Sequence, residues 1–212
     1  MSWTTYLLAI LLGYALGSIP FGYVYGRLKG VDVRTIGSGR TGGTNVYRSL
    51  GLGFGLLTGL SDGAKGFVAV LLARWLFGDE TAAALAGAFA VAGHNWPFTL
   101  GFKGGAGGGT AAGALIALNW LAAAISVPFF LLVLVVGRYA SLATLSAGFG
   151  ALITLTFFWA VEINGTPAGH VLFGVLICIL IVWALRPNIA RLAAGTERRI
   201  DFKHARGGEK GN

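Results

Sequence analysis

The sequence predicts an all-α integral membrane protein with seven transmembrane helices, a short fourth span, an external N-terminus and a cytoplasmic C-terminus. Three observations support this prediction. Of the 212 residues, 55% are hydrophobic and only 11% are charged, a composition too apolar for an ordinary soluble domain. The charges separate apolar stretches of about 20 residues, the length that a bilayer requires. The basic residues fall almost entirely on one side of these stretches.

The first three spans are predicted at 3–26, 52–77 and 82–100. No basic region precedes the first stretch, which argues against a cleaved signal peptide. The second stretch contains Asp62 and Lys65, and Asp79 and Glu80 separate it from the third. Charges inside a membrane are costly and usually functional. We therefore expect Asp62 and Lys65 to pair on one helix face, either within a site or as a structural pair.

The apolar stretch at 108–136 is too long for one span, because a helix of that length would measure about 43 Å against a hydrocarbon core of about 30 Å. Asn119 and Trp120 lie near its middle. The sequence therefore predicts a short helix to about 118 and another from about 121. Stretches at 141–161 and 168–185 complete the seven spans. Together they predict a single membrane domain over residues 1–200, followed by a polar, basic cytoplasmic tail at 201–212.

The distribution of Lys and Arg predicts the orientation. With the N-terminus outside, 14 of the 16 basic residues fall in cytoplasmic segments, and the opposite loops carry only acidic charges. Such an excess is typical of cytoplasmic loops. The net charge of +8 therefore reflects membrane topology. We expect no nucleic-acid partner, because the basic residues flank membrane spans and lack interleaved stacking aromatics.

Glycine makes up 35 of the 212 residues, well above the usual ~7%. Along the second span it recurs every four residues, at Gly51, Gly55, Gly59 and Gly63. Small residues at this spacing let helix backbones approach closely, and we interpret most span glycines in this way. The single Cys178 and three scattered histidines predict no disulfide framework, no metal site and no cofactor.

Two glycine-rich loops, at 36–48 and 102–110, lie on the basic side. Glycine permits backbone conformations in which N–H groups converge on an anion, and each loop leads into a helix N-terminus. The alternative is a flexible connection. Gly37, Gly39 and Gly42 fit the dinucleotide pattern G-x-G-x-x-G, but the loop lies between membrane spans, so we reject that match. No P-loop is present, which argues against an ATP-driven transporter. We interpret His94 as a hydrogen-bonded residue rather than a base.

Several motifs resemble the bacterial acyl-phosphate:glycerol-3-phosphate acyltransferases, the PlsY type, in the order of that family. The loop from Gly37 to Arg48 resembles its first motif, G-S-G-N-x-G-A-T-N-x-x-R. The segment 62–66 resembles D-x-x-K-G, residues 93–105 resemble G-H-x-x-P followed by F-K-G-G, and 138–142 resemble R-Y-x-S-L. Residues 188–197 resemble the third motif, N-I-x-R-L-x-x-G-T-E.

The resemblance implies transfer of an acyl group from acyl phosphate to glycerol-3-phosphate, giving lysophosphatidic acid and phosphate. It implies a monomer in the bacterial plasma membrane, surrounded by lipid, with the active site on the cytoplasmic side and the acyl chain between spans. The catalytic residues implied are Ser38, Arg48, Lys103 and Asn188. The substrate-binding residues implied are Gly37, Gly39, Arg40, Gly42, Thr44, Asn45, Lys65, His94, Gly104, Gly105, Gly107, Arg138, Ser141 and Arg191. Glu197 is expected to order the tail.

The chain departs from the family pattern at several positions. Arg40 replaces a usual Asn, Ala106 replaces the second Lys of K-G-G-K-G, and Leu185 replaces a usual His. The losses at 106 and 185 remove two candidate phosphate-binding groups, for which Arg40 is a partial substitute. One alternative is therefore a weak or inactive relative that binds or moves a phosphorylated lipid or small phosphate compound. A secondary transporter is a further alternative, disfavoured because no inverted repeat is present.

Overall fold

The computed structural model describes residues 2–201 and is built of helices, with no strand among those residues. The predicted tail lies outside the described residues except for Asp201. The helices are α1 (Trp3–Gly17), α2 (Phe21–Leu28), α3 (Gly43–Leu50), α4 (Leu52–Phe77), α5 (Glu80–Asn95), α6 (Gly108–Leu118), α7 (Trp120–Gly137), α8 (Ala140–Ala160) and α9 (Ala168–Ala193). Short 3₁₀ helices lie at Val33–Thr35, Phe98–Leu100 and Ile163–Gly165.

Five segments of the described chain are long and apolar enough to cross a membrane: Trp3–Leu28, Leu52–Phe77, Trp120–Gly137, Ala140–Ala160 and Ala168–Ala193. The two other predicted spans correspond to shorter helices, α5 with 16 residues and α6 with 11. The all-helical membrane class is therefore supported. The count of seven crossings and their orientation remain predictions.

The split of the long apolar stretch at 108–136 occurs where the sequence placed it. Helix α6 ends at Leu118 and α7 begins at Trp120. Asn119 caps α7, because its Oδ1 accepts a hydrogen bond of 3.0 Å from the backbone N–H of Ala122. A side-chain amide at this position satisfies a donor that the new helix would otherwise leave unpaired.

Three predicted boundaries differ from the structure. The first stretch is interrupted after Gly17 and resumes as α2 at Phe21, since Pro20 has no backbone N–H to continue the helix. The third ends at Asn95 rather than 100, because Pro97 follows. The last continues to Ala193, beyond the predicted 185, with Pro187 inside the helix.

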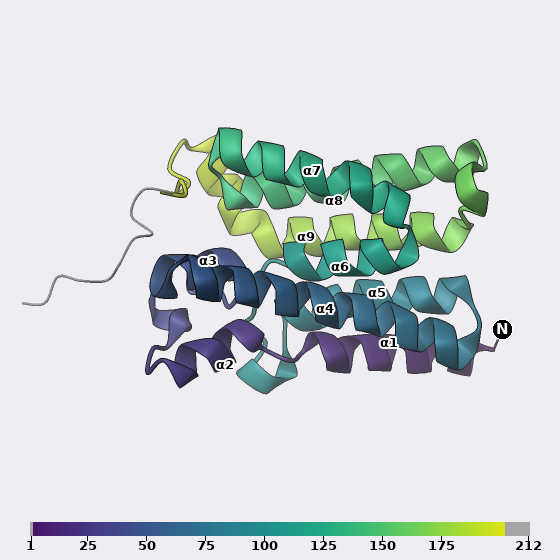
Figure 1. Ribbon diagram of the computed structural model, residues 1–212, viewed down its shortest axis with the longest axis horizontal. Coiled ribbons are helices and arrows are strands. Elements are labelled where there is room, and N and C mark those ends of the chain that lie inside the picture. The colour runs from purple at the N-terminus through teal and green to yellow at the C-terminus, as the bar shows by residue number, and fades with distance from the viewer. Residues whose placement is uncertain (1, 202–212) are drawn as a thin grey trace, which may run out of the picture.

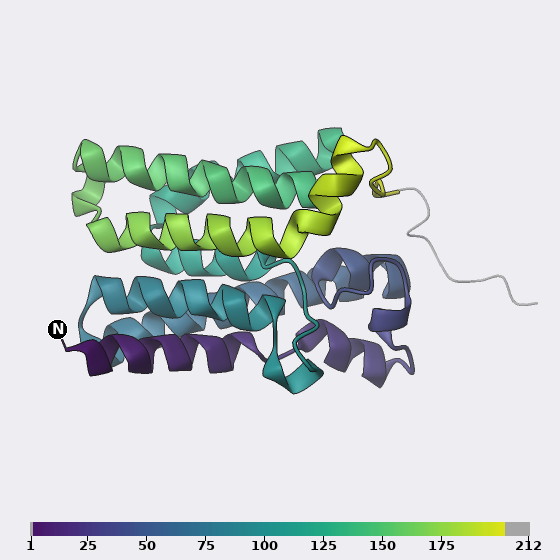
Figure 2. The same ribbon diagram turned by 180° about the vertical axis from the view of Figure 1, so that it is seen from behind.

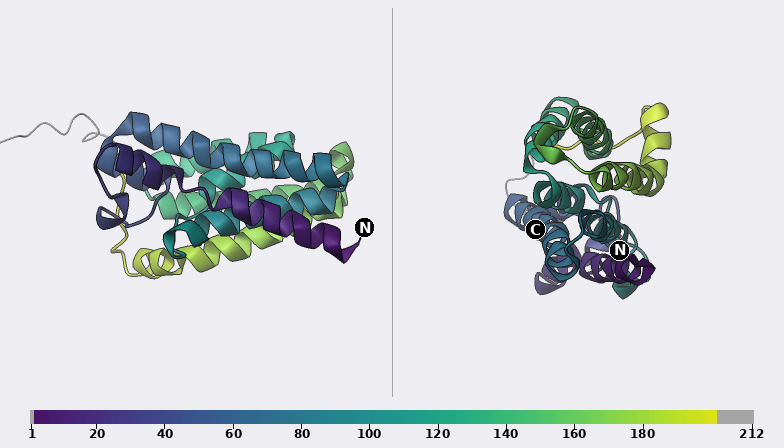
Figure 3. Two further views of the ribbon diagram at one scale, coloured as in Figure 1. Left: turned by 90° about the horizontal axis from the view of Figure 1, so that it is seen from below. Right: turned by 90° about the vertical axis from the view of Figure 1, so that its right-hand side faces the viewer.

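The helices form two groups that enclose α6. Helices α7, α8 and α9 lie on one side and α1, α4 and α5 on the other, as Figures 1 and 2 show. The right-hand view in Figure 3, along the bundle, shows α6 between the two groups. The first glycine loop and the segment after α9 lie at one end of the bundle, the second glycine loop lies further in between α5 and α6, and the N-terminus lies at the other end.

Several span glycines lie where backbones meet. A Cβ at Gly13 or Gly17 would overlap the backbone of α5 at Ala86 or Ala90, and a Cβ at Gly113 would overlap Gly63 of α4. These contacts confirm the packing interpretation for those positions. Gly51 departs from it, because it lies between α3 and α4 with φ 86°, and no atom lies within 4 Å of the place that a Cβ would take.

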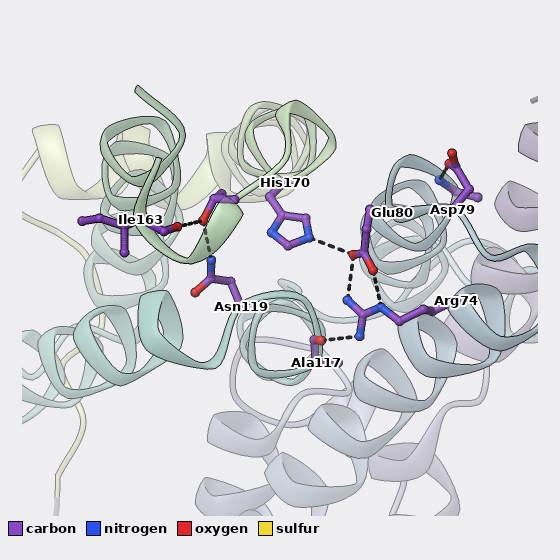
Figure 4. Close-up of polar contacts among 9 residues, drawn as sticks. Arg74, Asp79, Glu80, Ala117, Asn119, Ile163 and His170 are labelled. Carbon is purple, nitrogen blue, oxygen red and sulfur yellow. Dashed lines mark hydrogen bonds and ion pairs between the residues drawn. The ribbon is translucent and has the colours of Figure 1, made fainter. Parts of the chain in front are cut away.

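A polar cluster joins four helices at the end remote from the glycine loops (Figure 4). Arg74 donates to both carboxylate oxygens of Glu80 at 2.6 and 2.8 Å and to the carbonyl oxygen of Ala117 at 2.8 Å. His170 Nε2 lies 3.0 Å from the same carboxylate. The cluster ties the end of α4 to the starts of α5 and α9 and the end of α6.

Candidate active site

A cavity of about 680 Å³ opens among the glycine loops and continues between the two helix groups. Its deeper wall is apolar, formed by residues such as Leu115, Val127, Phe130 and Ile177 from α6, α7 and α9. Its outer end is polar. The predicted site residues that line this cavity are Gly37, Ser38, Arg40, Gly42, Thr44, Asn45, Arg48, His94, Gly107, Ser141, Asn188 and Arg191.

The first glycine loop is held in shape by Asn45. Its Oδ1 accepts from the backbone N–H of Ser38 at 2.8 Å, and its Nδ2 donates to the carbonyl oxygens of Val33 and Arg40, both at 2.8 Å. Gly37 and Gly39 adopt φ values of 60° and 71°, which side chains disfavour. The buried amide of Asn45 thus shapes the loop, and the Ser38 side chain lies at the cavity.

The second glycine loop folds back along the end of α5. The N–H groups of Gly104 and Gly105 donate to the carbonyl oxygens of Asn95 and His94 at 3.1 and 2.9 Å. A Cβ at Gly105 would overlap the ring of His94. Because these two N–H groups bond to the protein backbone, they are not free donors for an anion, contrary to the expectation for a phosphate-binding loop.

Backbone N–H groups without a hydrogen-bond partner among residues 2–201 lie instead at the starts of α3 and α6. Gly43 of α3 packs against Gly59 of α4, and Gly109 of α6 packs against the carbonyl oxygen of the same residue. The two helix N-termini therefore converge on one turn of α4, and both line the large cavity. Converging N-termini favour a bound anion through their unpaired N–H groups and helix dipoles.

Glu197, which the sequence assigned to ordering the tail, lies inside the polar end of the cavity. Its carboxylate accepts from Ser141 Oγ at 2.9 Å, Asn188 Nδ2 at 2.7 Å and Arg191 Nε at 2.8 Å. Burial raises the pKa of Glu197, but these hydrogen bonds outweigh it and hold the pKa below its usual value. Three predicted site side chains thus share one internal carboxylate.

The segment that carries Glu197 also lines the large cavity with Arg198 and Ile200. Ile200 exchanges hydrogen bonds with Arg138, whose Nε donates to its carbonyl oxygen at 2.8 Å. Arg198 donates to the carbonyl oxygen of Gly37 in the first glycine loop. Arg138, predicted as a substrate-binding residue, therefore lies outside the cavity lining and supports this segment.

Arg48, on α3, lines the polar end of the large cavity. Its side chain is partly buried, and its guanidinium makes no hydrogen bond to residues 2–201. Burial, followed by the positive charge of Arg198, lowers the pKa of Arg48. A partly buried cation without a protein partner is suited to binding an anionic ligand.

A second, smaller cavity of about 320 Å³ lies on the other side of Arg40. It is lined by Ser38, Gly39, Arg40, Asn95, Trp96, Phe102, Lys103, Gly104, Gly105 and Ala184. Lys103 is exposed there and does not line the large cavity. The structure thus divides the predicted site residues between two adjoining spaces.

Behind the loops lies a buried cluster of Asp62, Lys65 and His94. Lys65 Nζ lies 3.1 Å from Asp62 Oδ1 and 2.9 Å from His94 Nδ1, and it donates to the carbonyl oxygen of Ile19 at 2.9 Å. The predicted pairing of Asp62 with Lys65 is confirmed. Lys65 lines neither cavity, whereas Asp62 and His94 line the large one. No cluster of potential metal ligands occurs among the described residues.

Comparison with known proteins gives one consistent family. Residues 7–195 match the protein family described as glycerol-3-phosphate acyltransferase. A protein of that name from Rhodopseudomonas palustris (strain HaA2) is 44% identical over 93% of this chain and 97% of its own. One from Synechococcus sp. (strain CC9902) is 40% identical over 93% and 96%.

Solved structures agree. The glycerol 3-phosphate form of PlsY (YgiH), an integral membrane glycerol 3-phosphate acyltransferase, superposes with a TM-score of 0.82 at 38% identity, covering 92% of this chain and 96% of that chain. Its lysophosphatidic acid form superposes with a TM-score of 0.81 at 36% identity, covering 94% and 97%.

Proposed function

Because this chain belongs to the glycerol-3-phosphate acyltransferase family, we propose that it transfers an acyl group from acyl phosphate to glycerol-3-phosphate, giving lysophosphatidic acid and phosphate. One observation supports this most directly. The large cavity joins an apolar groove to a polar end where Arg48, Arg191 and two helix N-termini meet. That shape suits a ligand with a long acyl chain and a phosphate, and the smaller polar cavity adjoins it.

The chemistry is a direct displacement. A hydroxyl oxygen of glycerol-3-phosphate attacks the acyl carbonyl carbon, the bond from that carbon to the phosphate oxygen breaks, and phosphate leaves. The hydroxyl proton passes to a phosphate oxygen of the substrates. The donor is already activated, so no covalent enzyme intermediate is needed, and the protein contributes positioning and charge stabilisation.

We assign the groups as follows. Arg48 stabilises the negative charge on the departing phosphate, and the N–H groups at the starts of α3 and α6 assist it. The hydroxyl of Ser38, a residue that lines both cavities, and the Asn188 amide orient the reacting groups. Lys103 attracts the acceptor anion from the smaller cavity. No metal or cofactor takes part in this scheme.

The direct test is an assay of the purified protein with radiolabelled glycerol-3-phosphate and palmitoyl phosphate. We expect radiolabelled lysophosphatidate that depends on both substrates. Its absence at high protein concentration would contradict the proposal. Binding of lysophosphatidate without turnover would instead support the alternative of an inactive phospholipid-binding relative, which the apolar residues Ala106 and Leu185 in the cavity wall favour.

A pH–rate profile tests the proton acceptor. If substrate phosphate accepts the proton, kcat/KM rises with pH through the second phosphate ionisation, near pH 6, and His94→Asn leaves that midpoint unchanged. A midpoint that moves in His94→Asn would show that the histidine is the base.

We further propose seven membrane crossings in the bacterial plasma membrane, with α5 and α6 as two short ones, an external N-terminus and a cytoplasmic site. Exposed tryptophans support an interface at the N-terminal end of the bundle. The start of α1, the end of α4 and the end of α8 lie at that end, and the start of α7 lies toward it (Figure 1). These helix ends carry the exposed Trp3, Trp75, Trp159 and Trp120, respectively. Tryptophan is enriched at membrane–water boundaries. We propose that the chain works as a monomer surrounded by lipid.

The orientation is testable because Cys178 is buried and is the only cysteine. In a Cys178→Ala background, a cysteine replacing Asp79 should react with an impermeant maleimide added to intact cells. A cysteine replacing Arg34 should react only after the membrane is opened. The reverse pattern would contradict the proposed orientation.

A further inference from the structure

Arg40 stands at the junction of the two cavities. Among the described residues, only Ser38 and Arg40 line both spaces. Arg40 therefore lies at the boundary between the two cavities, next to any group bound in either of them.

The guanidinium connects three parts of the fold. Its Nη1 donates to the carbonyl oxygen of Gly105 at 2.9 Å. Its Nη2 donates to the carbonyl oxygen of Ala184 at 2.6 Å and to Asn188 Oδ1 at 3.2 Å. These partners lie in the second glycine loop and in α9, so Arg40 holds the first loop against both.

All three acceptors are neutral oxygens, and Arg40 forms no ion pair within residues 2–201. Burial lowers the pKa of Arg40, the neighbouring Arg191 lowers it further, and the charge of Glu197 opposes both effects. A partly buried charge that forms no ion pair is costly. Of the five guanidinium N–H donors, three are used, which leaves two for a ligand. The site thus contains a positive charge with unused donors at the boundary between its cavities.

Two of the three acceptor residues are each followed directly by a residue that departs from the family pattern. Gly105 precedes Ala106, and Ala184 precedes Leu185. Both apolar side chains line the large cavity. The Arg40 guanidinium therefore lies between the two positions at which the expected lysine and histidine are absent.

We propose that Arg40 binds a substrate phosphate at the junction of the two cavities and supplies the positive charge that positions 106 and 185 lack. This inference rests on the proposed acyl transfer and adds a residue-level assignment to it. The phosphate belongs either to glycerol-3-phosphate or to the acyl donor, and separate KM values for the two substrates distinguish them.

The first test is a set of variants assayed for kcat and for both KM values. Arg40→Asn should lower kcat/KM by about 10- to 100-fold, the loss of a charge-assisted hydrogen bond, chiefly by raising the KM of the substrate whose phosphate it binds. The matched control is Arg34→Asn, an exposed arginine of the same segment that pairs with Asp32 at 2.7 Å. This control should leave both constants unchanged.

The second test is the coupling between positions 40 and 106. Ala106→Lys should not raise activity when Arg40 is present, because two cations would then share one place. In the Arg40→Asn background the same lysine should restore about 10-fold or more of the lost activity. An equal effect of Ala106→Lys in both backgrounds would overturn the inference, as would unchanged KM values in Arg40→Asn.

A binding measurement separates this inference from the proposed function and from simple misfolding. Inorganic phosphate should raise the thermal denaturation midpoint of the unmodified protein in detergent. Arg40→Lys, which keeps the charge but not the fork of donors, should show a smaller shift, and Arg40→Asn should show little or none. Equal shifts in all three proteins would overturn the role of Arg40. If inorganic phosphate raises the denaturation midpoint of the unmodified protein but that protein forms no lysophosphatidate, only the proposed reaction is contradicted.

Discussion

The ammonium of Lys65 lies 2.9 Å from Nδ1 of His94, and both side chains are buried. Nδ1 also lies 3.4 Å from Asp62 Oδ1, so this nitrogen faces the buried ion pair of Asp62 and Lys65. Nε2, the other ring nitrogen, faces Gly105 at the cavity. The ion pair therefore orients the imidazole, and only Nε2 is turned toward the site.

Replacing Lys65 by Met should destabilise the protein. Asp62 would remain buried without its cation at 3.1 Å, and an unpaired buried charge costs about 3–5 kcal/mol. The midpoint of thermal denaturation in detergent measures the effect. The control Lys29→Met removes an exposed lysine whose ammonium lies 5.1 Å from the centre of the Phe54 ring and should change stability by about 1 kcal/mol or less. The double variant Asp62→Asn/Lys65→Met should recover part of the loss, and a Lys65→Met protein as stable as the parent would contradict the pairing.

Replacing Gly113 by Ala should force α4 and α6 apart. The new Cβ would overlap the backbone of Gly63, and such overpacking costs about 1–3 kcal/mol. Gly53, near the start of α4, has nothing within 4 Å of a Cβ position. Gly53→Ala should therefore be neutral or stabilise by up to about 1 kcal/mol, because Ala favours a helix. Denaturation midpoints that fall equally in both variants would show that the contact at Gly113 is not specific.

Replacing Glu197 by Gln should weaken the end of α9 in a pH-dependent way. The folded state holds the pKa of Glu197 below its usual value, so the carboxylate stabilises the fold at neutral pH, and this contribution is lost as the pH falls through the lowered pKa. We expect the variant to be about 1–3 kcal/mol less stable at pH ~7, with the difference shrinking in acid.

The exposed Glu162 provides the control for this comparison. Glu162→Gln should follow the parent protein at each pH in the same denaturation series. A difference between Glu197→Gln and the parent that grows on acidification would reverse the expected sign and contradict the assignment.

Replacing Glu80 by Gln should lower the stability of the protein slightly and leave its activity unchanged. Glu80 binds Arg74 and His170 at the end of the bundle away from the cavities, and its side chain is 40% exposed. Solvent screens the pair, so we expect a loss of about 1 kcal/mol or less with kcat/KM unchanged. A large fall in kcat/KM at permissive temperature would show that the cluster is coupled to the site.

The positions of most helices could be predicted from the sequence, because the length of an apolar run and the charges that bound it are local properties. The split at Asn119 was predictable for the same reason, since an unbroken run would exceed the membrane thickness. The interruption after Gly17 was missed, because the apolar run continues through Pro20 and only the backbone shows the break.

The site was predictable only in outline. Both predicted glycine loops line the candidate cavities. The pairing of Asp62 with Lys65 was predictable from their spacing on one helix. The hydrogen bonds of the second glycine loop were not predictable. The N–H groups of Gly104 and Gly105 donate to carbonyl oxygens at the end of α5, and only the folded chain brings these groups together. The role of Glu197 was also hidden, since its bond to Ser141 joins residues 56 positions apart.

The sequence by itself determined the membrane class, the approximate helix positions and the family, because each depends on residue type and short-range order. Only the tertiary structure decided which groups of the site are free to bind a ligand. Arg40 bonds to Ala184 across 144 positions of the chain, and no local pattern contains that contact. A donor is available to a substrate only if the fold has left it unpaired, and that depends on every neighbour brought there by packing.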